Sequence, residues 1–161
     1  MATPTYIPLA TVTLAASSSA IFFTNISQDY SDLVLVREFT STSNHSAYAQ
    51  FNGDNGNNYS WVTAQAQNTA DSSAGTTNSI FGALGYTTVA GLDITQIMDY
   101  SATDKHKTIL QRRDTASALT GMFAYRWANT DAITSITSIS SSSHQFAAGS
   151  TFKLFGIHGE V

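Results

Sequence analysis

Short runs of β-forming residues, separated by clusters of Gly, Asn, Asp and Ser, follow one another along almost the whole chain. In residues 10–14, the apolar Ala10, Val12 and Leu14 alternate with two threonines, so a strand there has one apolar and one polar face. Apolar residues at helical spacing are nearly absent. This pattern predicts an all-β protein and is typical of a sandwich or barrel.

The β-forming runs predict the number and type of sheets. We expect strands over residues 10–14, 20–24, 33–36, 47–51, 59–63, 92–100, 108–112, 122–127, 133–139 and 151–157. About nine or ten strands fit a two-sheet antiparallel β-sandwich with a jelly-roll-like topology. The run Leu33–Val36 is apolar on both faces, which predicts a central strand covered on two sides, and another subunit is a candidate for one cover.

Three further segments are informative. Residues 52–58 contain two Asn-Gly steps, which supply the positive φ angles of tight turns. Residues 65–88 are polar, small and irregular, and we expect a long surface loop there. Phe123, Tyr125 and Trp127 alternate along one run, which predicts an aromatic row in the core or at an interface.

The composition favours a protein that contacts other proteins. The 161 residues fit a single domain, 1–161, in which segment 1–9 is a candidate docking arm. Charged residues make up 11% of the chain, far below the roughly 25% of typical soluble domains. Hydroxyl and amide side chains replace them, so the surface lacks the charge repulsion that keeps copies apart.

Several classes of partner and chemistry are not expected. The net charge of −4 provides no attraction for phosphate backbones, so we expect no nucleic acid partner. The chain has no cysteine, which excludes disulfides and thiolate sites. No apolar run approaches the roughly 20 residues of a membrane span, and residues 1–14 lack the features of a secretion signal, so we expect a soluble protein with no membrane partner.

The sequence argues against an enzyme. His45, His106, His144 and His158 lie in polar or turn-like contexts, where exposed histidines are usual, and no G-x-S-x-G motif is present. Asp93 and Asp99 are a conceivable carboxylate pair, but we expect them at strand edges or facing outward. No catalytic residue and no cofactor are therefore predicted.

Two polar clusters have both a structural and a functional interpretation. Residues 52–58 offer oxygen ligands but lack the acidic spacing of a calcium loop, so we favour a turn and predict no metal. Lys105, His106 and Lys107, with Arg112 and Arg113, form the one basic cluster. This cluster fits an acidic patch on a partner or, more simply, a solvated strand end.

Four stretches of the chain resemble a family of small β-rich structural proteins of tailed bacteriophages. They are YSDLVLV at residues 30–36, FNGD with NNYS at 51–60, WANTDAITSI at 127–136 and FAAGSTFKLFGI at 146–157. The resemblance implies a virion component, and because no shaft or coiled coil is visible, we favour a head decoration or cement protein on the outer surface of the head, assembled in the host cytoplasm. It also implies major capsid protein subunits as partners and a homo-oligomer, for which a trimer suits a three-fold junction.

The alternative is a tail or fibre module that binds a host-surface glycan through aromatics such as Tyr59 or Trp61. For either role, the interface candidates are apolar residues in polar surroundings and the basic cluster: Tyr6, Ile7, Ile80, Phe81, Lys105, Lys107, Arg112 and Arg113.

Overall fold

The computed structural model describes residues 5–66, 70–85, 89–115, 119–141 and 144–158. The regular structure of these residues is entirely β. The twelve strands are β1 (Tyr6–Thr13), β2 (Ala20–Phe23), β3 (Asp32–Phe39), β4 (His45–Phe51), β5 (Tyr59–Ala66), β6 (Ala70–Thr77), β7 (Ile80–Gly85), β8 (Gly91–Met98), β9 (Lys107–Thr115), β10 (Leu119–Trp127), β11 (Ile136–Ser140) and β12 (Thr151–Ile157).

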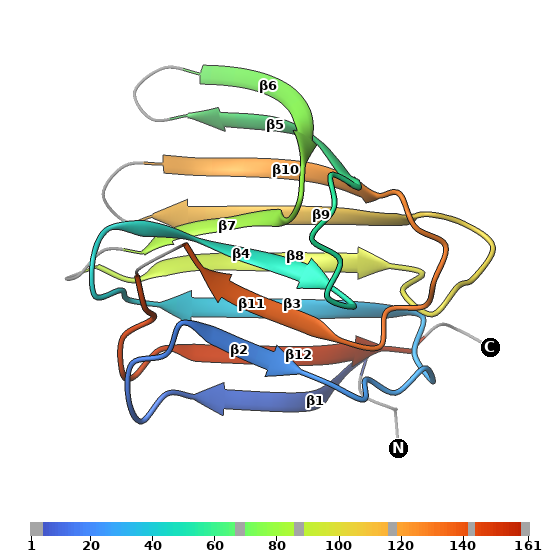
Figure 1. The fold of residues 1–161 in the computed structure, drawn as a ribbon, viewed down its shortest axis with the longest axis horizontal. Helices are drawn as coiled ribbons and strands as arrows, with labels where there is room; N and C mark the ends of the chain where they lie inside the picture. The colour runs from blue at the N-terminus through green and yellow to red at the C-terminus, as the bar shows by residue number, and fades with distance from the viewer. Residues whose placement is uncertain (1–4, 67–69, 86–88, 116–118, 142–143, 159–161) are drawn as a thin grey trace.

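The strands form two antiparallel sheets that face each other (Figure 1). The large sheet has eight strands in the order β1-β12-β3-β8-β9-β10-β5-β6, and the small sheet has four in the order β2-β11-β4-β7. The predicted all-β, two-sheet antiparallel architecture is confirmed, although the described residues form more strands than expected. The small sheet lies over the middle and lower part of the large sheet as Figure 1 is drawn, and β5 and β6 extend past it.

The core lies between the two sheets and is rich in aromatic rings. Phe123, Tyr125 and Trp127 are all buried on one face of β10, which confirms that the aromatic row belongs to the core. The Trp127 ring packs edge-on against Phe51 from the small sheet, with centroids 5.5 Å apart. It also stacks with Tyr59 on the neighbouring strand at 6.4 Å. Such pairs add about 0.5–1.5 kcal/mol beyond their buried area and join the two sheets.

The Asn-Gly turn after β4 is held by polar contacts. Asn52 and Gly53 have φ angles of 52° and 70°, and the Asp54 N–H donates to the Phe51 carbonyl oxygen at 2.8 Å. The Asp54 carboxylate accepts hydrogen bonds from the Trp127 indole at 2.7 Å and from the Asn58 amide. These donors occupy the oxygens that a cation needs, so the turn is structural.

The expectation of a long loop over residues 65–88 is wrong for the described part of this segment. It contains the end of β5, all of β6 and β7, while residues 67–69 and 86–88 lie outside the description. The small polar residues of β6 concealed the strand because residues 72–76 are exposed on both faces. A strand without a buried face needs no apolar alternation, and β6 is held by its backbone pairing with β5.

Two other predicted segments can be compared with the structure. In the candidate docking arm 1–9, residues 6–8 pair with β12 as the first part of β1, and residues 1–4 lie outside the described residues. Of the predicted strand 133–139, only residues from Ile136 onward form β11. Ile133 lies in the preceding loop with its side chain buried, and its N–H donates to the Tyr100 carbonyl oxygen at 2.8 Å.

Replacing Asp54 tests how strongly the turn is coupled to the core. Asp54→Ala leaves the Trp127 indole N–H without its charged acceptor, so we expect the free energy of unfolding to fall by about 2–3 kcal/mol. Burial alone raises the pKa of Asp54, but hydrogen bonds from Trp127, Asn58 and Gly56 outweigh burial and lower this pKa. Urea unfolding measures the difference, and the exposed Asp104→Ala is the control, with an expected change within about 0.5 kcal/mol. Equal effects of the two variants contradict the prediction.

Candidate functional site

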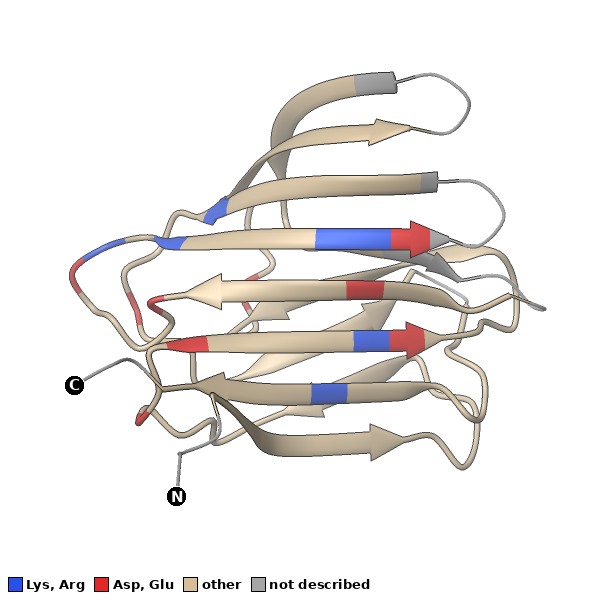
Figure 2. Ribbon diagram, turned by 180° about the vertical axis from the view of Figure 1, so that it is seen from behind, with Lys and Arg blue, Asp and Glu red and all other residues tan. Residues whose placement is uncertain are grey.

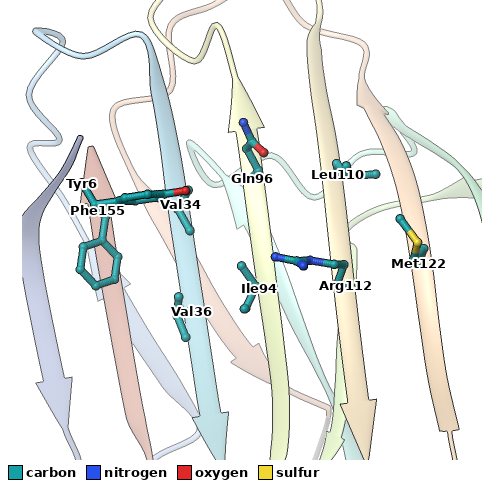
Figure 3. Close-up of a pocket in the computed structure, with 9 residues that line it drawn as sticks. All are labelled: Tyr6, Val34, Val36, Ile94, Gln96, Leu110, Arg112, Met122 and Phe155. Carbon is teal, nitrogen blue, oxygen red and sulfur yellow. The ribbon is translucent and has the colours of Figure 1, made fainter. Parts of the chain in front are cut away.

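The large sheet has an outer face that the small sheet does not cover. Figure 2 looks onto this face, and no described segment of the chain crosses in front of the strands. Its centre is a groove with a volume of about 540 Å³. The groove is lined by Tyr6, Val34, Val36, Ile94, Gln96, Leu110, Arg112, Met122 and Phe155 (Figure 3). Seven of these nine side chains are apolar or aromatic, so the groove suits a protein surface better than a small polar substrate.

The apolar character of the outer face extends beyond the groove. An adjoining hollow of about 350 Å³ shares Ile94, Arg112 and Met122 with it and adds Leu92. Tyr6 and Met122 are 56% and 51% exposed, and Val62 on β5 is exposed as well. Large apolar side chains exposed singly are ordinary, but here they adjoin one another across six neighbouring strands. This contiguous surface is the candidate functional site.

The usual polarity of a sheet is inverted at the centre of the outer face. In β8, Asp93 and Thr95 point into the core, whereas Leu92 and Ile94 point outward. In β9, Gln111 is fully buried while Leu110 is exposed. Side chains alternate along a strand, so one register sets both faces. Polar residues inside and apolar residues outside are unfavourable for a sheet with one face in water, which makes the outer face the candidate surface for contact with another molecule.

Charged side chains on the outer face are few and of both signs (Figure 2). Arg112 lies in the groove and is directed toward Ile94 in Figure 3. The other outward charges on the strands are Asp32, Glu38, Asp114, Arg126 and Lys153. The balance of three acidic and three basic groups provides no net field over this face, so recognition there depends on apolar contact and shape.

A buried polar network lies on the opposite, inner face of the large sheet. The Arg37 Nε donates to the Asp93 carboxylate at 2.8 Å, and both side chains are fully buried. The same guanidinium donates to the Tyr48 carbonyl oxygen and to the Ser138 hydroxyl of the small sheet. The expectation that Asp93 faces outward is therefore wrong, because its charge is matched inside by Arg37. With no exposure, this pair cannot reach a substrate.

His45 sits in a second buried polar cluster. Its Nε2 lies 2.9 Å from the Ser140 hydroxyl, its Nδ1 contacts the Ser41 hydroxyl, and its ring stacks on His144 with centroids 5.3 Å apart. The expectation of an exposed histidine is wrong for His45, because nearby serines satisfy both ring nitrogens inside the fold. The pair resembles part of a Ser-His-Asp triad, but Ser140 is buried and a serine takes the carboxylate's place. The geometry is that of a structural cluster.

The predicted basic cluster does not form a patch. Lys107 is fully buried, and its ammonium donates to the carbonyl oxygens of Ala102, Lys105 and Thr130 at 2.6–3.1 Å. Arg113 points inward, where it lies 4.2 Å over the Phe123 ring and donates to the Gly82 carbonyl oxygen. The prediction of an accessible interface is wrong for Lys107, because loop carbonyls take all three of its donors.

The remaining interface candidates are spread over the molecule. Tyr6 and Arg112 both line the groove. Lys105 is exposed and pairs with Asp99 at 3.2 Å, far from the groove along the 99–106 loop. Ile7 is half-buried at the edge of the large sheet. Ile80 is fully buried in the core, so its side chain cannot contact a partner, and the Phe81 side chain lies outside the description.

Sequence reasoning missed most of the outer face. Ile94, Leu110, Met122 and Phe155 are predicted in strands but not at an interface, whereas the run Leu33–Val36, which includes Val34, is predicted to have another subunit as a candidate cover. The signal for finding them was present in Leu92–Thr95, where apolar and polar residues alternate in a strand at the centre of the sheet. The pattern leaves open which set faces the core, and the fold decides it.

Among the described residues, no group of acidic or histidine side chains is arranged to hold a metal ion, and no helix could cross a membrane. No match was found to a protein-family model, to a curated protein or to a solved structure.

Lys107 and Lys105 form a matched pair for testing the buried ammonium. Lys107→Met removes the donor from three loop carbonyls, so we expect the free energy of unfolding to fall by about 2 kcal/mol or more. Lys105→Met breaks only an exposed ion pair and should change it by less than about 1 kcal/mol. Urea unfolding compares the two, and an equal loss in both variants contradicts the assignment.

The His45 cluster predicts a pH dependence of stability. Burial lowers the pKa of His45 below its ordinary 6.5, so the folded chain stays neutral where the unfolded chain binds a proton. The free energy of unfolding should therefore decrease as the pH falls below about 6.5, until the pKa of the folded state is reached. We expect the thermal unfolding midpoint to drop between about pH 7.5 and about pH 5. His45→Gln should reduce this drop, whereas exposed His106→Gln should leave it unchanged.

Proposed function

We propose that this protein is a structural component of a tailed-phage particle, without catalytic activity, that stabilises the head by docking on capsid subunits. It docks through the outer face of the large sheet. The observation that carries the proposal is the inverted polarity of β8 and β9, where Asp93 and Gln111 are buried while Leu92 and Leu110 are exposed. A covering protein surface removes this apolar area from water and accounts for the arrangement.

The strand order supports a jelly-roll topology within the sandwich. Four strands of the large sheet, β1-β12-β3-β8, lie opposite β2-β11-β4-β7. Numbered 1 to 8 in chain order without the hairpins β5–β6 and β9–β10, these strands have the order 1-8-3-6 in the large sheet and 2-7-4-5 in the small sheet. Every connection crosses between the sheets except the one from β4 to β7, as in a jelly roll. The two hairpins then extend only the large sheet. Jelly rolls are frequent in viral capsid and lectin domains, which agrees with a particle protein but does not by itself establish a function.

The size of the outer face fits a stable interface. Eight strands about 4.8 Å apart, with about eight residues rising about 3.3 Å each, give a face of roughly 34 Å by 26 Å. This footprint is close to the roughly 800 Å² that each partner buries in a standard protein–protein interface. Docking on two adjoining capsid subunits would raise the work needed to separate them, since the contact with at least one subunit must break as well.

The alternative, a tail or fibre module that binds a host glycan, has support from a different surface. A hollow of about 450 Å³ on the small-sheet side is lined by Tyr48, Gln50, Thr77, Asn78, Ser79, Ile139, Ser140 and Ser141. One aromatic ring among amides and hydroxyls suits a sugar. However, Tyr59, one of the two aromatics expected to bind a glycan, is fully buried in the core. Immunogold labelling of purified particles separates the two roles, because label on the tail alone contradicts head decoration.

Charged substitutions in the groove test the docking face. Leu110→Glu combined with Met122→Glu places two carboxylates in the interface, and each lost apolar contact costs about 1.5–3 kcal/mol. We expect binding to heads that lack the protein to weaken by about 100-fold or more. The rise in head-disruption temperature that the native chain produces should disappear.

The control variant is Phe22→Glu on β2, because Phe22 is 64% exposed on the opposite side of the molecule. It should bind heads like the native chain. Circular dichroism confirms that each variant folds. Unchanged binding of the Leu110 and Met122 variant contradicts the proposed face.

A further inference from the structure

The two edges of the large sheet are built differently. The β1 edge contains Pro8, which has no N–H to donate, and its pairing with β12 shifts register between Pro8 and Ala10. Both features prevent another strand from adding to an edge. The β6 edge has neither, since Ala70–Thr77 contains no Pro, Lys or Arg and pairs with β5 over eight consecutive residues without a shift. Only the β1 edge is protected.

The β6 strand also projects from the sandwich. In Figure 1, β5 and β6 lie beyond β7, the last strand of the small sheet. Residues 72–76 are exposed, and Gly75 lies so close to the Trp61 indole that a Cβ there would be 3.3 Å from the ring. In β6 itself, residues 72–76 have no cover on either face, so pairing of the free edge with a further strand would stabilise this strand.

The projecting edge also offers a second copy little charge. The chain has a net charge of −4, so two copies repel each other. No residue of β5 is charged, and Asp71, at the beginning of β6, is the only charged residue in that strand. In Figure 2, the described parts of these two strands contain no Lys, Arg, Asp or Glu, in contrast to β3, β8 and β9. Electrostatic repulsion along β6 is therefore small.

We infer that β6 pairs antiparallel with β6 of a second copy, so that the two large sheets become one continuous sheet across a two-fold axis. Backbone N–H and C=O groups of the open edge supply the hydrogen bonds. The exposed side chains of Ser72–Thr76 are small, so they leave no pockets that would select the side chains of a foreign peptide. Pairing between identical strands needs no such pockets.

This pairing goes beyond the proposed docking on capsid subunits and uses different residues. It is two-fold, unlike the trimer that the resemblance implies. It also places two outer faces in one continuous sheet, so that two copies dock together with higher avidity than one. The groove residues Leu110 and Met122 lie on β9 and β10, away from the paired edge. Loss of pairing and loss of docking can therefore be measured separately.

Cysteine scanning tests the pairing directly, because the chain has no cysteine of its own. In a two-fold antiparallel pair, one residue of β6 lies directly opposite its own copy, with Cα atoms about 4.5–5.5 Å apart, a spacing that permits a disulfide. We expect oxidation of Ser72→Cys, Ser73→Cys, Ala74→Cys and Thr76→Cys, each made singly, to give a disulfide-linked dimer with one clear maximum along the strand. Thr11→Cys on exposed β1 is the matched control and should form no disulfide-linked dimer.

Light scattering provides the second measurement. The native chain should have twice the mass of one 17.2 kDa chain, and Ala74→Lys should halve that mass by placing two ammonium groups at the paired edge. Thr11→Lys, which adds the same charge to the β1 edge, should leave the dimer intact. Any one of three results overturns the inference. The native chain stays monomeric at all concentrations, or it forms a trimer that Ala74→Lys does not dissociate, or cysteines at Thr11 and along β6 cross-link equally.

Discussion

A buried ion pair between two neighbouring strands determines which way the centre of the large sheet faces. Arg37 on β3 and Asp93 on β8 are register partners, and their 2.8 Å contact lies wholly inside the sandwich. The next pair in the same register, Val36 and Ile94, must then point outward because side chains alternate. Shifting β8 alone by one residue would bury Leu92 and Ile94 and expose Asp93, but the pairing of Asp93 with Arg37 and the buried Leu33, Leu35 and Phe39 on the Arg37 face of β3 fix the observed register. The observed arrangement therefore suits a sheet whose outer face is also covered.

The ion pair contributes specificity more than stability. Removing two charges from water costs several kcal/mol per ion, and the pair recovers this cost only through good geometry and further hydrogen bonds. Here the Arg37 guanidinium also bonds the Tyr48 carbonyl oxygen and the Ser138 hydroxyl, so it connects the large sheet to the small one. A Cβ on Gly82 would collide with the same guanidinium, which explains glycine at this point of β7. The inner network thus fixes the sheet register and the placement of the small sheet together.

The sequence was informative where one face of a strand meets the core. Met122–Trp127 and Thr151–Ile157 alternate cleanly, and both form strands close to the predicted bounds. The prediction of exposure failed where the structure buries a charged or polar residue. Asp93, His45 and Lys107 were read as exposed because charged and polar residues usually are, yet each has partners from segments distant in sequence or from loop carbonyls. Such partners depend on the tertiary fold, and the outer face was missed for the same reason: alternation along a strand does not say which side is the core.

The surface of the protein carries even fewer charged groups than the sequence contains, because some of them are buried. Only seven Lys and Arg and eleven Asp and Glu are present, and among them Arg37, Asp93 and Lys107 are fully buried. Surface charge is the main means by which small domains avoid unspecific contact, so a chain that places charges inside must control association by other means. The β1 edge provides one such means, because Pro8 and the adjacent register shift prevent another strand from pairing with it. The outer face and the β6 edge lack any comparable protection, and a protein that protects one edge while leaving these two surfaces open is best explained by partners that occupy them.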